Sequence, residues 1–184
     1  YDFIMNDAEA KICFVSDEEI FSKVNAVKSK IETLKEVYSF DQINSCKSWT
    51  EVKDLGKGKH EDQMKTIQAG IQETDLATLI YTSGTTGRPK GVMLSHKNLV
   101  SNATASRLRL PVTEDSKSLS FLPLCHVYER MVCYMYIYTG TSIYYAESLE
   151  TIGDNLREVK PDVFTAVPRL LEKVYDKIVA KGQE

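Results

Sequence analysis

The sequence predicts an α/β protein with a layered α/β/α arrangement and a mostly parallel sheet. Short apolar runs of strand length alternate with segments of helical periodicity, which is the pattern of parallel strands joined by helices. The 184 residues suffice for one ordinary domain or two incomplete lobes, and 42% of them are hydrophobic, so a sizeable core is expected. The net charge of −3 argues against a nucleic-acid binder.

The first elements follow from short local patterns. The continuous apolar run Ile12–Val15 predicts a strand that is buried on both faces. Asp17 is the expected N-cap of a helix with one apolar stripe. That stripe consists of Ile20, Val24, Val27 and Ile31. Residues 33–41 predict a second strand, and the polar, lysine-rich residues 44–75 predict one short helix. The apolar positions of that helix are Met64, Ile67 and Ile71.

The second half repeats the alternation. Leu76–Tyr81 predicts a strand, and a loop rich in Gly, Thr and Ser follows it. Gly91–Leu94 is short and apolar, and Ser95 is the expected N-cap of a helix that continues to about Leu108. Three further strands are predicted at Leu119–Leu122, Ile143–Ala146 and Val163–Val167. The remaining helices are predicted at residues 126–138, at about 149–159 and from Pro168 onward.

The chain is interpreted as a fragment of a longer protein, because it does not start with Met and stops just beyond a helix. We expect a first α/β lobe at 1–110, a connecting segment at 111–118 and the start of a second lobe at 119–184. No run approaches the length of about 18 apolar residues typical of a membrane span, and no signal peptide is visible, so a cytoplasmic location is expected. The spacing of the four cysteines and three histidines favours reduced thiols over a zinc site or a disulfide framework.

The segment most informative about function is residues 81–92, Tyr-Thr-Ser-Gly-Thr-Thr-Gly-Arg-Pro-Lys-Gly-Val. Its three glycines permit positive φ angles and let main-chain N–H groups approach a ligand closely. Its hydroxyl and cationic side chains add donors and positive charge, and this combination predicts a cradle for a polyphosphate. The hydroxyls are those of Thr82, Ser83, Thr85 and Thr86, and the cations are Arg88 and Lys90.

Other interpretations of this loop are weaker. The Walker spacing GxxxxGK[ST] is absent, because position 89 is Pro and Lys90 is followed by Gly91. A G-x-G-x-x-G dinucleotide fingerprint is absent too. A solvated surface loop is the usual explanation of a Ser/Thr/Gly tract. Here the tract directly follows an apolar strand and ends in Pro-Lys-Gly, which favours phosphate binding.

The string YTSGTTGRPKG resembles the phosphate-loop signature of the adenylate-forming (AMP-binding) enzymes, a group that includes acyl-CoA synthetases, nonribosomal peptide adenylation domains and luciferases. Residues 122–130, LPLCHVYER, and 167–175, VPRLLEKVY, look like the long-chain fatty acyl-CoA synthetase branch. Residues 6–15 fit the first lobe of that branch. The resemblance covers essentially the whole chain and implies an incomplete N-terminal domain of an acyl-CoA synthetase.

The resemblance implies a long-chain-fatty-acid–CoA ligase that uses ATP, Mg²⁺ and CoA. A fatty acid carboxylate attacks the α-phosphorus of ATP to give acyl-adenylate and pyrophosphate, and the CoA thiol then displaces AMP. By the same resemblance, Lys90 and His126 are catalytic, and the Thr85 hydroxyl binds Mg²⁺. The phosphate contacts are Thr82, Ser83, Gly84, Thr85, Thr86, Gly87 and Lys90.

Several residues keep two interpretations. His126 lies near the acyl carboxylate by resemblance, but a helix-start histidine bonded to backbone is almost as good an explanation. Glu129 and Arg130 are expected to pair with each other or with neighbouring helices and to have no catalytic role. Some tyrosines either line an acyl tunnel or pack in the core. These are Tyr128, Tyr134, Tyr136, Tyr138, Tyr144 and Tyr145. No catalytic role is assigned to His60, His96 or Arg169.

Parts of the family's machinery are missing from the chain. The Glu that completes the Mg²⁺ site, the ribose-binding Asp and the C-terminal domain with its lysine do not occur in it, so the isolated chain is expected to be inactive. Exposed apolar surface is expected to favour dimerisation. The alternatives are a non-catalytic nucleotide- or acyl-binding module and a ligase for an aryl or medium-chain acid. The expected partners are small molecules and not nucleic acid, and peripheral contact with a membrane stays open.

Overall fold

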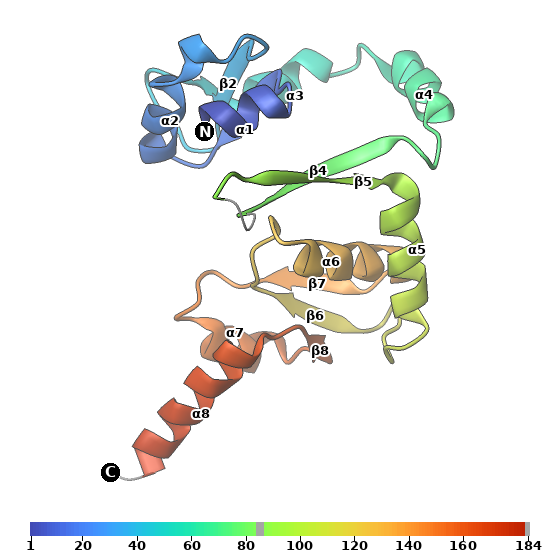
Figure 1. The fold of residues 1–184 in the computed structure, drawn as a ribbon. Helices are drawn as coiled ribbons and strands as arrows, with labels where there is room; N and C mark the ends of the chain where they lie inside the picture. The colour runs from blue at the N-terminus through green and yellow to red at the C-terminus, as the bar shows by residue number, and fades with distance from the viewer. Residues whose placement is uncertain (84–86, 183–184) are drawn as a thin grey trace. The chain divides into compact units, whose positions relative to one another are not determined.

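The computed structural model describes residues 1–83 and 87–182. The chain divides into two compact units, which are Tyr1–Asp75 with Tyr81–Met93, and Leu76–Ile80 with Leu94–Glu184. Each unit combines helices with a parallel three-stranded sheet, so the predicted α/β class is confirmed (Figure 1). A third, two-stranded sheet is formed by β4 (Leu76–Thr82) and β5 (Lys90–Ser95), which both contribute residues to the two units.

The first unit is built on a parallel sheet with strand order β1-β2-β3. Its strands are β1 (Ile12–Val15), β2 (Glu36–Ser39) and β3 (Lys47–Ser48). Its helices are α1 (Asp2–Asp7), α2 (Glu18–Asn25), the 3₁₀ turn η1 (Lys28–Lys30), α3 (Trp49–Gly56) and α4 (Glu61–Gly70). The predicted N-cap is confirmed, because the Asp17 carboxylate accepts a hydrogen bond from the Ile20 N–H at 3.0 Å. The α2 side of the sheet carries the core, which consists of Val15, Phe21, Val24, Ile31, Leu34 and Val37.

The prediction that β1 is buried on both faces is wrong. Val15 is buried, but Ile12 is 52% and Phe14 47% exposed. Residues i and i+2 of a strand point to the same face, and here α2 and its core residues cover only the face of Val15. The other face carries a row of aromatic rings, in which Phe14 lies 5.6 Å from Tyr38 and 6.0 Å from Phe40 between ring centroids.

The polar stretch 44–75 forms two helices where one was predicted. A capping box starts α3: the Ser48 N–H donates to the Glu51 carboxylate at 3.0 Å, and the Ser48 hydroxyl accepts from the helix backbone. The second helix, α4, contains the predicted apolar positions Met64 and Ile67, but both side chains are exposed. Local capping chemistry therefore starts α3, a helix that an apolar stripe does not announce.

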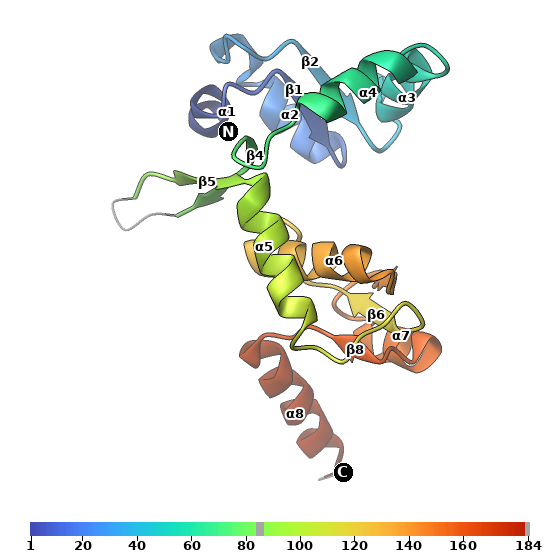
Figure 2. The ribbon, with the colours of Figure 1, turned by 90° about the vertical axis from the view of Figure 1, so that its right-hand side faces the viewer.

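The second unit has a parallel sheet with strand order β7-β6-β8. Its strands are β6 (Lys117–Ser120), β7 (Ser142–Tyr145) and β8 (Val163–Phe164), and its helices are α5 (His96–Arg107), α6 (Val127–Thr139), α7 (Ile152–Val159) and α8 (Pro168–Gly182). α6 links β6 to β7, and α7 links β7 to β8 on the other side of β6. Right-handed crossovers in opposite directions place the two helices on opposite faces of the sheet (Figures 1 and 2).

Two helix starts in this unit follow the sequence. Ser95 caps α5 with a capping box in which Asn98 is the reciprocal partner, and Pro168 is the first residue of α8. α5 packs across α6 (Figure 2), and their shared core contains Ala103, Val132, Met135 and Tyr136. Residues 111–118, the predicted connecting segment, lie within this second unit. Among the described residues, no helix combines the length and apolar character needed to cross a bilayer.

Candidate functional site

The predicted phosphate loop joins the end of β4 to the start of β5. β4 ends at Thr82 and β5 begins at Lys90, and the side chains of Thr82, Ser83, Arg88 and Lys90 are exposed. Exposed hydroxyls and two cations leave this rim open to an anion from solvent. The predicted contacts Gly84, Thr85 and Thr86, including the proposed Mg²⁺ ligand, lie outside the described residues.

Two glycines of the loop have specific backbone reasons. Gly87 has φ +80°, a backbone conformation that residues other than glycine rarely adopt. Gly91 lies against the ring of Tyr81, because a Cβ atom placed on it would be 3.0 Å from Tyr81 Cζ. The motif therefore uses one glycine for a turn and another for close packing on its own first residue.

Tyr81 also anchors the loop to the N-terminal part of the first unit. Its hydroxyl donates a hydrogen bond to Asp7 Oδ2 at 2.6 Å. That bond, with a smaller effect of burial and of the Asp7 charge, raises the pKa of Tyr81 to about 12. Asp7 is the last residue of α1, so a contact between residues 74 positions apart fixes the strand from which the loop leaves.

His126 is the N-cap residue of α6, as expected for a helix-start histidine. Its backbone N–H donates to the Pro123 carbonyl at 3.0 Å, but its exposed side chain makes no capping hydrogen bond. The imidazole therefore stays available, at the end of the loop that follows the carboxyl end of β6. Ligands bind at this edge of open parallel sheets. His126 belongs to the second unit and the phosphate loop to the first.

Glu129 and Arg130 do not pair with each other. The Glu129 carboxylate is 1% exposed and accepts hydrogen bonds from the hydroxyls of Ser120 and Thr165. Arg130 points elsewhere and donates to the Thr78 hydroxyl at 2.9 Å and to the Tyr134 hydroxyl at 3.0 Å. Adjacent helix positions project about 100° apart, so the two side chains face different surroundings. The buried Glu129 has no signal in the sequence beyond its place in the string LPLCHVYER.

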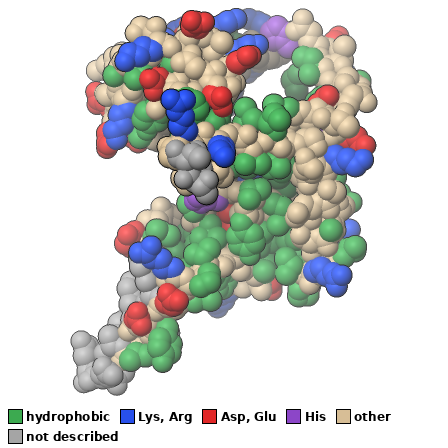
Figure 3. Space-filling model, viewed as in Figure 1, with side chains coloured by type: hydrophobic (Ala, Val, Ile, Leu, Met, Phe, Trp, Pro, Cys, Tyr) green, Lys and Arg blue, Asp and Glu red, His purple; other side chains and the backbone are tan. Residues whose placement is uncertain are grey.

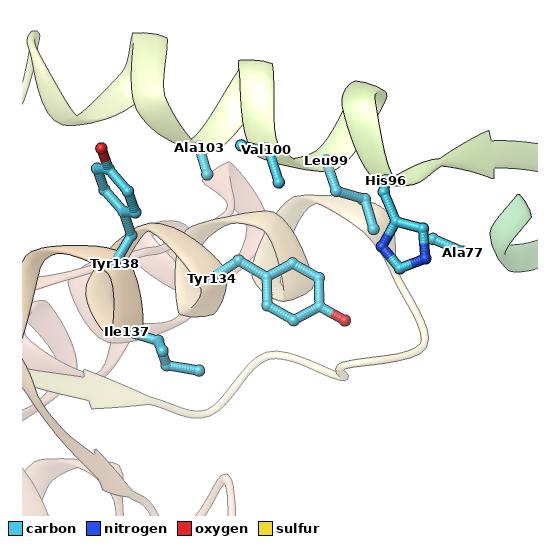
Figure 4. Close-up of a pocket in the computed structure, with 8 residues that line it drawn as sticks. All are labelled: Ala77, His96, Leu99, Val100, Ala103, Tyr134, Ile137 and Tyr138. Atoms are coloured by element: carbon cyan, nitrogen blue, oxygen red, sulfur yellow. The ribbon is translucent and has the colours of Figure 1, made fainter. Parts of the chain in front are cut away.

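An apolar cavity of about 440 Å³ lies between β4, α5 and α6 (Figure 4). Its lining residues are Ala77, His96, Leu99, Val100, Ala103, Tyr134, Ile137 and Tyr138. Two of the tyrosines with an open interpretation thus line the cavity, whereas Tyr136 is buried in the core between α5 and α6. His96 begins α5 as expected and also contributes to the cavity wall. A volume of this size is within the range of small-molecule sites.

The remaining polar candidates have structural roles. His60 is the N-cap residue of α4, and its Nδ1 lies 2.9 Å from the Gln63 side-chain oxygen. All four cysteines are free, and burial raises the pKa of the Cys13, Cys46 and Cys133 thiols. In the described part of the chain, no three His, Cys, Asp or Glu side chains gather as a metal site. On the face shown in Figure 3, many hydrophobic side chains of the second unit are exposed.

Comparison with known proteins gives concordant matches. The family model of the AMP-binding enzymes matches residues 1–184. A probable CoA ligase, CCL6, from Humulus lupulus is 33% identical over 98% of this chain and 29% of its own length. The long-chain-fatty-acid–CoA ligase ACSBG2 of Xenopus laevis is also 33% identical, over 98% of this chain and 26% of its own. The chain thus spans less than a third of the length of these relatives.

Solved structures agree with the sequence relatives. A long-chain-fatty-acid-CoA ligase (FadD1) from Archaeoglobus fulgidus superposes with a TM-score of 0.73 and 25% identity, over 92% of this chain and 32% of the other. ATP-bound MatB from Rhodopseudomonas palustris superposes with a TM-score of 0.66 and 25% identity, over 94% of this chain and 32% of the other. With the family model matched from end to end, the chain belongs to the family of AMP-binding enzymes and corresponds to an N-terminal portion of their fold.

Proposed function

We propose that the protein carrying this chain activates a long-chain fatty acid with ATP and transfers the acyl group to CoA. The observation that carries the proposal is the segment 81–92, where exposed hydroxyls and Lys90 stand beside a glycine held at positive φ. In a chain of the AMP-binding family, that segment is the natural place for the triphosphate of ATP. The relatives named above, which include long-chain fatty-acid ligases, support the choice of acid.

The chemistry asks for positioning and charge neutralisation. In the first step one anion, the fatty acid carboxylate, attacks the α-phosphorus of another, and pyrophosphate leaves. Thr82, Ser83 and Lys90 would bind phosphate oxygens, and the Lys90 ammonium would offset the charge that grows on pyrophosphate. Main-chain N–H groups near Gly84 and Gly87 and the hydroxyls of Thr85 and Thr86 would complete the cradle. The roles at 84–86 rest on the motif.

A magnesium ion suits this donor set. Mg²⁺ prefers oxygen ligands and is commonly held by few protein groups together with substrate phosphates. The Thr85 hydroxyl is the proposed protein ligand within this chain. When bound with ATP, the ion would neutralise part of the triphosphate charge.

The apolar cavity between α5 and α6 is the proposed site of the acyl chain. Its wall is formed almost entirely by apolar and aromatic side chains, and its polar groups are the His96 imidazole and the hydroxyls of Tyr134 and Tyr138 (Figure 4). Such a wall excludes water and favours an alkyl chain by about 25 cal/mol per Å² of apolar area removed from water. His126 is proposed to hold the acyl carboxylate by a hydrogen bond from its free imidazole.

Acyl-dependent ATP–pyrophosphate exchange tests the proposal in the longest natural gene product that contains this chain. We expect exchange with acids of about 16 carbons to exceed exchange with acetate, benzoate or octanoate by at least tenfold, because each buried CH₂ adds roughly 0.8 kcal/mol. Faster exchange with benzoate or octanoate would assign the enzyme to the aryl or medium-chain ligases instead. Absence of exchange with every acid, with ATP still bound, would favour the non-catalytic module.

The 184-residue chain alone is proposed to lack this activity. It spans 29% or less of the two curated relatives described above, and the family elements expected to complete the Mg²⁺ site, hold the ribose and contact the adenylate are missing from its sequence. The same exchange assay on the isolated chain should give the rate of a protein-free blank. An acyl-dependent rate above the blank would contradict this part of the proposal.

A further inference from the structure

Glu129 is a deeply buried carboxylate of the second unit for which the reaction above has no use. Its side chain is 1% exposed, although it belongs to the first turn of α6, where the neighbouring Val127 and Tyr128 are exposed. Burying a carboxylate is costly unless donors replace its water. This carboxylate therefore has to be explained by the groups that face it.

The two oxygens of Glu129 are held by two different strands. Oε1 accepts from the hydroxyl of Ser120, the last residue of β6, and Oε2 accepts from the hydroxyl of Thr165, the residue after β8. Both donors are themselves buried. Hydrogen bonds to a charged acceptor are worth about 1.5–3 kcal/mol each, and a carboxylate in the first turn is also favoured by the helix dipole. One side chain thus fastens the start of α6 to the carboxyl ends of two adjacent parallel strands.

Glu129 lies at the centre of a cluster of buried polar side chains, which also contains Ser120, Thr165, Cys133 and Tyr136. Cys133, one turn further along α6, lies 3.7 Å from the Ser120 hydroxyl. The Tyr136 hydroxyl is buried without a hydrogen-bond partner, and burial, followed by the charge of Glu129, raises the pKa of Tyr136 to about 12. Both neighbours therefore stay neutral at ordinary pH. No lysine or arginine of the described chain forms an ion pair with Glu129, so its position is set by the two hydroxyls.

We propose that Glu129 is a positioning residue that acts through His126; this inference rests on the proposed function. His126 is the N-cap residue of α6 and Glu129 lies three positions later, so both belong to the same first turn. The His126 side chain is exposed and has no capping bond of its own. Its location at the sheet edge is therefore fixed by whatever fixes that turn, and the bonds from Ser120 and Thr165 do so. Functional side chains need such support to keep productive geometry.

A double-mutant cycle in the longest natural gene product tests this role. Glu129→Gln keeps the shape of the side chain but removes its charge and one acceptor. We expect it to lower kcat for acyl-dependent exchange about tenfold to a hundredfold, the effect of a displacement of about 1 Å, and to leave KM for ATP within twofold. In a His126→Ala background, the same substitution should lower kcat less than twofold further, because the group it positions is gone.

The outcomes separate the two levels of the argument. If Glu129 were only structural, Glu129→Gln would lower the unfolding temperature without changing kcat, or would reduce kcat by the same factor in both backgrounds; either result overturns the inference and leaves the proposed function intact. A wild-type enzyme with no exchange activity overturns both. Should Glu129→Gln fail to fold, the cycle is run with Thr165→Val, which removes one donor and for which the same non-additivity with His126→Ala is required.

Discussion

The hydroxyl of Tyr81 donates a 2.6 Å hydrogen bond to the carboxylate of Asp7. The bond joins the end of α1 to β4 just before the phosphate loop, and the ring of the same tyrosine would lie only 3.0 Å from a Cβ atom placed on Gly91 in β5. The first and last parts of the motif are thus fixed by one aromatic side chain. The hydroxyl and cationic side chains of the loop are therefore carried by a strand whose position is set without any bound ligand.

This relationship predicts an alkaline titration. The bond to Asp7 raises the pKa of Tyr81 from 10.0 to about 12, so its stabilisation is complete below pH 10 and is lost as the pH rises from 10 toward 12. Asp7→Asn should move the Tyr81 pKa back toward 10, because amide oxygen is a weaker acceptor without charge. Ultraviolet titration of phenolate, with Tyr81→Phe subtracted to isolate this residue, measures it. An unchanged Tyr81 pKa in Asp7→Asn would contradict the structure.

Gly87 offers a test of the loop's backbone. An alanine there is strained by about 1–2 kcal/mol at φ +80°, and we expect Gly87→Ala to weaken ATP binding about tenfold through loss of loop geometry. Gly58→Ala is the matched control, since Gly58 also has positive φ, at +67°, and open space around it. Thermal unfolding should show equal destabilisation in the two variants. Equilibrium binding of ATP should be weakened only in Gly87→Ala.

Lys90 is the cation with the clearest predicted role. Lys90→Ala should lower the adenylation rate of the full-length enzyme about a hundredfold or more, as loss of a donor to developing charge does elsewhere, while its circular dichroism and unfolding temperature stay unchanged because the side chain is exposed. Lys59→Ala, another exposed lysine of the same unit, provides the control. Pyrophosphate release at the wild-type rate from Lys90→Ala would remove this residue from the mechanism.

Much of the fold was accessible from the sequence because local rules and tertiary structure agree there. The strand Ile12–Val15, the cap at Asp17 and the helix that Ser95 starts are confirmed. β6 shows where such rules fail. Its predicted start is two residues late. Ser118 and Ser120 are polar yet buried, and a search for apolar runs does not find a buried strand that contains polar residues. Classifying residues only as apolar or polar also makes α3 hard to predict, because this helix depends on a capping box and not on an apolar stripe.

The candidate site was predictable to a different degree. The loop motif identifies residues 81–92 from the letters alone, and the left-handed turn at Gly87 fits its glycine. Glu129 could not be recognised as a buried acceptor, since its donor Thr165 is 36 positions away and only the parallel pairing of β6 with β8 brings the two together. The Asp7–Tyr81 bond could not be predicted either, because its two residues are 74 positions apart in the sequence. Long-range contacts of this kind are properties of the topology.

The apolar cavity predicts how acid preference responds to volume. Val100 lies on its wall and is 58% exposed, so a larger side chain there enters the cavity without overfilling the core (Figure 4). Val100→Phe should reduce kcat/KM for acids of about 16 carbons tenfold or more and leave that for acids of about 6 carbons within twofold, because only the longer chain needs the filled volume.

The next residue on the helix supplies the control for that experiment. Ser101 is exposed on α5 and does not line the cavity, so Ser101→Phe places the same aromatic side chain on this helix outside the cavity. Exchange kinetics over a series of chain lengths should separate the two variants progressively as the acid grows. If Val100→Phe and Ser101→Phe respond identically at every length, the acyl chain lies elsewhere, and the cavity between α5 and α6 is then a packing feature of this unit.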